Sequence, residues 1–320
     1  MEKSELHWAS VRQIGPYWGM RFVLLLQSLL GTRLCLFLIT PVVGFYFLFN
    51  RHGRLASQDY LQQISSYQPE LQLKANWRTS FKHFLAFTEA MLDKLATWNG
   101  KIGVEDVDIH GREAFLSSLK GQQGAVILCS HLGNIEVSHA LANLNAHAKL
   151  NILAHTKHAQ TFNRLIKHVS RSEQVELIEV TEISPAVAIM LQEKIAKGEF
   201  VCIVGDRIPV NNQTRIVACD FLGKPAYFAQ GPFILASLLK CPVYTLFCLK
   251  IKGRYRLYFE HFADQITLAR KDKDIALQQY AMQFAQRLQQ HCIKAPLQWF
   301  NFYFYWQDYL EDTKTGTDNQ

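Results

Sequence analysis

The stretch Ala125–Glu136 reads Ala-Val-Ile-Leu-Cys-Ser-His-Leu-Gly-Asn-Ile-Glu and decides the fold. Its first part, Ala125–Cys129, is apolar throughout, which is typical of a strand buried on both faces of a sheet. Further along, Gly133 allows a close backbone approach to a substrate, and Asn134 is a residue type that caps the start of helices. The stretch therefore places His131 just beyond the carboxyl end of a buried strand, where α/β sheets bind their ligands.

Outward from this stretch, strand-like and helix-like segments alternate along most of the chain. Further strands are predicted at 104–109, 150–154, 175–180, 200–204, 243–249 and 255–260. Helices are predicted within 55–100, at 112–119, from about 134 onward, and at 158–168, 184–197, 232–239 and 275–293. Asn99-Gly100 is expected to end the first of these, and Ser184 with Pro185 to begin the fifth. The alternation predicts an α/β fold with a mixed, largely parallel central sheet flanked by helices.

The N-terminal stretch Met20–Phe49 is strongly apolar and carries only two charges. Gly31 and Arg33 interrupt it, and Arg33 at the centre of a bilayer would cost about 2.5–3.5 kcal/mol. We therefore expect a kinked or shallow membrane-inserted helix, with Arg51 and Arg54 at a cytoplasmic interface. The alternative is a long apolar helix buried against the rest of the protein.

The chain is predicted to have three parts. Residues 1–54 form an N-terminal membrane-associated helical segment, residues 55–310 form the α/β domain, and residues 311–320 form a disordered tail. The length of 320 residues is sufficient for one large domain with such an appendage.

Composition restricts the possible partners. The net charge is +7, but the basic residues form no dense cluster, so we expect a membrane surface as the partner and no nucleic acid. The seven cysteines include no C-x-x-C pair, so we predict that they are buried free thiols in a reducing compartment. No P-loop, G-x-G-x-x-G, G-x-S-x-G or convincing metal-ligand pattern occurs, so no metal or bound cofactor is expected.

His131 and Glu136 form an H-x-x-x-x-E pair whose carboxylate is expected to fold back toward the imidazole. A histidine held by a carboxylate has a fixed tautomer and raised basicity, as a general base requires. The spacing alone is weak, because His168 and Glu173 have the same spacing. The latter pair lies at a predicted helix end without a preceding strand, so location favours His131 as catalytic over a structural strand-end histidine.

The segment Gly205-Asp206-Arg207 follows another buried strand, 200–204. Such a turn presents a guanidinium to a phosphate or carboxylate, with Asp206 orienting Arg207. The alternative is a local turn closed by an ion pair. Residues 220–226 are expected to be a loop before a helix start at Pro232, whose amides could instead receive an anion. The aromatic run 299–306 predicts either core closure or a membrane-interface belt.

Four blocks in this order resemble the lysophospholipid acyltransferase superfamily: residues 130–136, 205–207, 221–226 and 296–302. Within it, the chain resembles the bacterial lipid A biosynthesis (lauroyl/myristoyl) acyltransferases, and most closely the subgroup encoded in aryl polyene gene clusters. The resemblance runs from about Trp18 to Trp306. One departure is Asn301-Phe302-Tyr303, which stands where a basic stretch is expected and leaves the site less cationic.

The resemblance implies a glycerolipid acyltransferase-like fold and an inner-membrane enzyme at the cytoplasmic face. A fatty or aryl polyenoyl chain would pass from an acyl carrier protein (ACP) or coenzyme A (CoA) thioester to a hydroxyl of a lipid or glycolipid acceptor. It also implies that His131 is the base and Glu136 its partner. The residues expected to bind substrate are Gly133, Asn134, Asp206, Arg207, Asn163 and Arg164.

Other readings stay open at this point. A catalytic thiol at Cys129 would give a covalent acyl-enzyme instead of direct transfer. The chain could also be an inactive membrane docking partner of a biosynthetic cluster, or a thioester hydrolase with water as acceptor.

Overall fold

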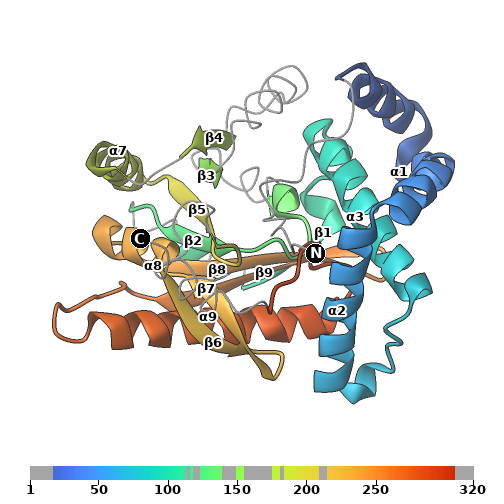
Figure 1. Cartoon of the computed structure of the whole chain (residues 1–320). Helices are drawn as coiled ribbons and strands as arrows, with labels where there is room; N and C mark the ends of the chain where they lie inside the picture. The colour runs from blue at the N-terminus through green and yellow to red at the C-terminus, as the bar shows by residue number, and fades with distance from the viewer. Residues whose placement is uncertain are drawn as a thin grey trace, which may run out of the picture.

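The structure, a computed structural model, describes residues 17–111, 113, 116–117, 123–138, 149–154, 175–180, 184–208 and 215–306. Within these ranges a seven-stranded mixed sheet has the order β1-β9-β8-β2-β5-β3-β4 (Figure 1). Strands β8, β2, β5, β3 and β4 run parallel, whereas β9 is antiparallel to β8, and β1 runs parallel to β9. The strands are β1 (Val107–His110), β2 (Val126–Cys129), β3 (Leu150–Ala154), β4 (Val175–Glu179), β5 (Phe200–Val204), β8 (Val243–Ile251) and β9 (Arg254–Ala263). The predicted α/β fold with a largely parallel sheet is confirmed.

Strand β2 lies at the centre of this sheet because every one of its side chains is apolar. Val126 and Leu128 pack into one hydrophobic cluster, and Ile127 and Cys129 pack into another on the opposite face. Burying both faces removes the most apolar surface from water, which is the main favourable term in folding. The apolar run therefore fixes β2 between β5 and β8.

Helices cover the sheet and position the candidate site. They are α2 (Arg51–Tyr67), α3 (Trp77–Trp98), α7 (Pro185–Ala196), α8 (Gly231–Leu239) and α9 (Lys273–Lys294), with short 3-10 turns at Pro69–Leu71, Val104–Asp106 and, as η4, Ile135–Ser138. Figure 1 shows α9 running along the sheet beside the separate hairpin of β6 (Ile216–Phe221) and β7 (Lys224–Ala229). The predicted caps are confirmed: Ser184 Oγ accepts the Val187 N–H, and α3 ends at Asn99.

The N-terminal helix α1 (Tyr17–Phe49) is kinked at Gly31, whose φ of 75° and ψ of 170° are non-helical, as the sequence predicts. Its segment Leu29–Phe49 is long and apolar enough to cross a membrane. Val43 and Phe47 pack against Phe84 of α3, but most large apolar side chains on this segment stay exposed. A helix buried against the domain would cover them, so the exposure favours a membrane-associated helix. Helix α2 then runs through the expected boundary at residue 54.

Two local predictions are wrong. Residues 220–226 belong to the β6–β7 hairpin, whose two-residue turn at Leu222-Gly223 has φ of 56° and 77°, as hairpin turns with positive φ require. Asn134 does not cap a helix with its side chain, because its Nδ2 donates to the Ala90 carbonyl, 3.0 Å away on α3.

Candidate active site

Strand register brings His131 and Asp206 together. Cys129 at the end of β2 is the register partner of Val204 at the end of β5. His131 and Asp206 each lie two residues beyond these ends, and the Gly205 N–H donates to the Cys129 carbonyl at 2.9 Å. Two parallel neighbouring strands that end together deliver both side chains to the same edge of the sheet.

The His131 imidazole is hydrogen-bonded to Asp206. The distance from Nδ1 to Oδ1 is 2.8 Å, and the His131 backbone N–H donates to Oδ2 at 2.9 Å. Asp206 is fully buried, whereas the His131 side chain is 29% exposed. Because an ionised carboxylate only accepts hydrogen bonds, Nδ1 carries the proton and Nε2 keeps its lone pair. This arrangement suits a general base that a substrate can reach.

Two side chains from the C-terminal segment also donate to Asp206. Trp299 Nε1 lies 2.8 Å and Asn301 Nδ2 lies 3.2 Å from Oδ2. Backbone pairing holds the segment in place, since Leu132 forms an antiparallel bridge with Trp299 and the Phe300 N–H donates to the His131 carbonyl. Oδ2 therefore accepts three donors, and Oδ1 faces the imidazole.

Burial and charge set the ionisation of this pair. Burial lowers the pKa of His131, and the nearby Arg207 charge lowers it further, against the opposing effect of Asp206. For Asp206, burial alone would raise the pKa, but the charge and hydrogen bonds of His131 bring it below its ordinary value. At neutral pH the imidazole is thus neutral and the carboxylate ionised, as proton abstraction requires.

The expected contact between Glu136 and His131 is not what the structure shows. Glu136 lies in η4, and its carboxylate contacts the Lys94 ammonium of α3. The carboxylate that is hydrogen-bonded to the imidazole is Asp206. The physical reason is that η4 directs Glu136 toward α3, whereas the β2–β5 register directs Asp206 toward the imidazole.

The backbone N–H groups of Gly133 and Asn134 bond within the fold. The Gly133 N–H donates to the Gln298 carbonyl at 2.8 Å, and the Asn134 N–H donates to the Cys248 carbonyl at 2.9 Å. A Cβ on Gly133 would lie 2.0 Å from that Cys248 oxygen. Both amides are therefore engaged within the fold, and neither fits the expected stabilisation of a reaction oxyanion.

Arg207 is held by the same C-terminal segment. Its Nε donates to Asn301 Oδ1 at 2.8 Å, one Nη donates to the Phe300 carbonyl at 3.1 Å, and its guanidinium lies 6.0 Å from the Tyr303 ring centroid. Asn301 thus joins Arg207 to Asp206. The contacts of Trp299 and Asn301 with Asp206 were not predicted from the sequence, although the aromatic run 299–306 and the block 296–302 both marked this segment.

Several predictions concern other residues. Asn163, Arg164 and the pair His168 and Glu173 lie outside the described residues. All seven cysteines are free and buried, as predicted. Burial raises the pKa of the Cys129 thiol well above its ordinary value, which disfavours a covalent acyl-enzyme at this residue. In the described part of the chain no group of three His, Cys, Asp or Glu side chains is arranged to hold a metal ion.

A family comparison identifies the class of enzyme. Residues 6–308 match the model of the bacterial lipid A biosynthesis acyltransferase family. The chain belongs to this family. It is therefore an acyltransferase of the lipid A type, and its substrates include an acyl donor and a lipid acceptor. A comparison with curated proteins finds no match.

Proposed function

We propose that this acyltransferase moves a fatty or aryl polyenoyl chain from an acyl-ACP or acyl-CoA thioester to a hydroxyl of a lipid or glycolipid acceptor. The reaction takes place at the cytoplasmic face of the bacterial inner membrane. The observation that carries the proposal is the His131–Asp206 hydrogen bond of 2.8 Å at the sheet edge of a family acyltransferase. A partly exposed, neutral imidazole beside a buried carboxylate is the arrangement that hydroxyl activation needs.

In the proposed mechanism, His131 Nε2 takes the acceptor's proton while the acceptor oxygen attacks the thioester carbonyl. Asp206 stays ionised and stabilises the imidazolium that forms. The tetrahedral intermediate then collapses, the carbon–sulfur bond breaks, and the thiolate takes the proton back from the imidazolium. Direct transfer requires neither a metal nor a covalent acyl-enzyme.

Arg207 and Glu136 have distinct proposed roles. Arg207 supplies the positive charge that stabilises the oxyanion, because Asn301 and Phe300 fix its guanidinium beside the histidine–aspartate pair. Glu136 acts through Lys94, whose ammonium it contacts, and sets the charge around the acceptor. Asn163 and Arg164, which lie within the family match, have a proposed role in substrate binding.

Membrane association is supported by α1. The exposed apolar side chains of Leu29–Phe49 would lie in lipid, and Arg54 stays at the end of this segment through its bonds to the Phe47 and Leu48 carbonyls. These features support a position of the α/β domain next to the membrane from which a lipid acceptor would enter.

The test is lipid mass spectrometry of a deletion strain that expresses the wild type or His131→Ala. One acylated lipid present with the wild type should disappear with His131→Ala. The matched control is His261→Ala, because His261 also pairs with an aspartate, Asp264, at 3.0 Å but lies exposed at the surface. Full acylation by His131→Ala would overturn the assignment.

A further inference from the structure

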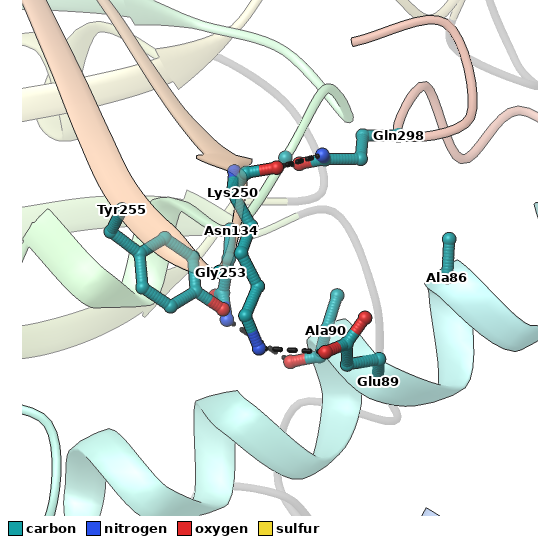
Figure 2. Close-up of a pocket in the computed structure, with 9 residues that line it drawn as sticks. Ala86, Glu89, Ala90, Asn134, Lys250, Gly253, Tyr255 and Gln298 are labelled. Atoms are coloured by element: carbon teal, nitrogen blue, oxygen red, sulfur yellow. Dashed lines mark hydrogen bonds and ion pairs between the residues drawn. The ribbon is translucent and has the colours of Figure 1, made fainter. Parts of the chain in front are cut away.

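A pocket of about 150 Å³ lies beside the candidate active site, between α3 and the ends of β8 and β9 (Figure 2). Part of its wall is formed by residues with small or no side chains: Ala86, Ala90, Gly133 and Gly253. Their small size leaves the space open.

Two chain segments connect the pocket to the reacting residues. Asn134, which lines the pocket, follows His131 by three residues, so their Cα atoms lie within about 11 Å. Gln298, which also lines it, precedes Trp299, whose indole donates to Asp206. A substrate whose reacting carbonyl lies at His131 therefore has its neighbouring atoms within reach of the pocket.

Asn134 carries an unsatisfied acceptor. The side chain is 3% exposed, and its Oδ1 has no hydrogen-bond partner among the described residues. The amide orientation is fixed, because Nδ2 donates to the Ala90 carbonyl and a flipped amide would place two oxygens together. Buried polar atoms without partners are rare in folded proteins, so Oδ1 requires a donor from a ligand or water.

The charged groups around the pocket are already paired. Lys250 Nζ lies 2.7 Å from Glu89 Oε1 and 2.5 Å from Asp93 Oδ2, and the Tyr255 hydroxyl donates to Asp93 at 2.6 Å. Figure 2 shows Lys250 reaching from β8 to Glu89 on α3. Because these charges compensate one another, we expect Asn134 Oδ1 to accept a hydrogen bond from a neutral N–H or O–H donor and not from an ion.

We propose that this pocket binds the first amide of the pantetheine arm of the acyl donor, with Asn134 Oδ1 accepting its N–H. The inference rests on the proposed thioester reaction. In every acyl pantetheine, two methylenes separate the thioester sulfur from a neutral secondary amide. An amide N–H therefore always lies a fixed, small number of bonds from the reacting carbonyl. ACP and CoA share this arm, and the pocket would recognise either donor.

The test compares two synthetic donors, the lauroyl thioester of N-acetylcysteamine and its analogue with an ester oxygen in place of the N–H. The full-length enzyme in detergent micelles is given total bacterial lipid as acceptor, and thiol release is measured with lauroyl-CoA as reference. The wild type should use the amide donor with a kcat/KM about tenfold higher, the worth of one hydrogen bond. Asn134→Ala should lose this preference.

The matched control is Asn151→Ala. Asn151 is also fully buried with an unpartnered Oδ1, but it lies at the start of β3 and does not line the pocket. It should retain the tenfold preference. A second variant, Ala86→Leu, keeps a good helix former and fills the pocket, so it should also lose the preference.

The outcomes separate the two proposals. Equal use of both synthetic donors by the wild type would overturn the amide site while leaving acyl transfer standing. The same holds if Asn134→Ala keeps the preference. No transfer from lauroyl-CoA or from either synthetic donor would overturn the proposed function, and the amide site with it.

Discussion

Asp206→Asn is the sharpest perturbation of the proposed site, because the structure dictates which way the new amide must face. Three donors surround Oδ2, from the His131 backbone, Trp299 and Asn301. The amide oxygen must take that position, since an NH₂ group there would meet three N–H groups. The amide nitrogen then faces His131 Nδ1 and donates to it.

This orientation forces the wrong tautomer. With Nδ1 accepting, the proton of the neutral imidazole moves to Nε2, and His131 can no longer take a proton from the acceptor. The same exchange in the serine-protease triad lowers kcat by about 10⁴, and we expect a loss of 10³–10⁴ here. At 1.36 kcal/mol for each factor of ten, that is about 4–5 kcal/mol of transition-state stabilisation.

The assay is thiol release from lauroyl-CoA by the purified enzyme in micelles, measured across pH. In the wild type, activity should fall on the acid side with a midpoint below 6.5, because burial lowers the His131 pKa. Asp206→Asn removes a carboxylate that raises this pKa, so the imidazole is still deprotonated at neutral pH. Raising the pH should therefore not restore activity.

Glu136→Gln is the matched control, since it makes the same chemical change in a carboxylate that contacts Lys94 and not the imidazole. It should reduce activity far less than Asp206→Asn does, and both variants should unfold within a few degrees of the wild type. If Asp206→Asn stayed within tenfold of the wild-type rate while Glu136→Gln lost a thousandfold, the assignment of Asp206 would be refuted.

Three further predictions concern the support of the site. Burial lowers the pKa of His83 from 6.5 to about 4, so between these pH values the unfolded state binds a proton that the folded state does not. The free energy of unfolding should therefore fall by about 3 kcal/mol as the pH drops from 6.5 to 4. In denaturant titrations, His83→Gln should lose this part of the acid sensitivity. Trp299→Phe keeps the ring but removes the indole donor to the carboxylate; kcat should fall about tenfold with KM unchanged, and a change in KM alone would contradict this. Gly133→Ala drives a Cβ into the Cys248 carbonyl and should lower the free energy of unfolding by about 3 kcal/mol or more. Gly253→Ala has a similar positive φ but open space around it, so it should lower the free energy of unfolding by only about 1 kcal/mol. Equal losses of stability in thermal unfolding would disprove the steric argument.

Local chemistry made several elements predictable from sequence. The apolar run Ala125–Cys129 predicts β2, because only the centre of a sheet can bury every side chain of a strand. Ser184 and Pro185 locate the start of α7, because capping and a fixed φ act within one turn. Gly31 locates the kink in α1, because glycine readily adopts the positive φ found there.

Contacts between distant segments could not be predicted in this way. The β6–β7 hairpin turns at Leu222-Gly223, where Leu222 adopts a positive φ that its residue type disfavours. The Asn134 side chain bonds to the Ala90 carbonyl of α3 rather than capping the next turn. In both cases tertiary packing overrides the local preference of the residue.

The class of fold, the kinked apolar helix and the position of His131 beyond a buried strand all follow from the order of residues along the chain. The sequence also carries the ordered blocks that mark the acyltransferase family. Which carboxylate is hydrogen-bonded to the imidazole depends instead on how the strands pair in space. Glu136 is close in sequence, but η4 directs it to Lys94, whereas Asp206 is 75 residues away and arrives through the pairing of β2 with β5. Hydrogen bonds depend on distance in space, and strand order sets that distance.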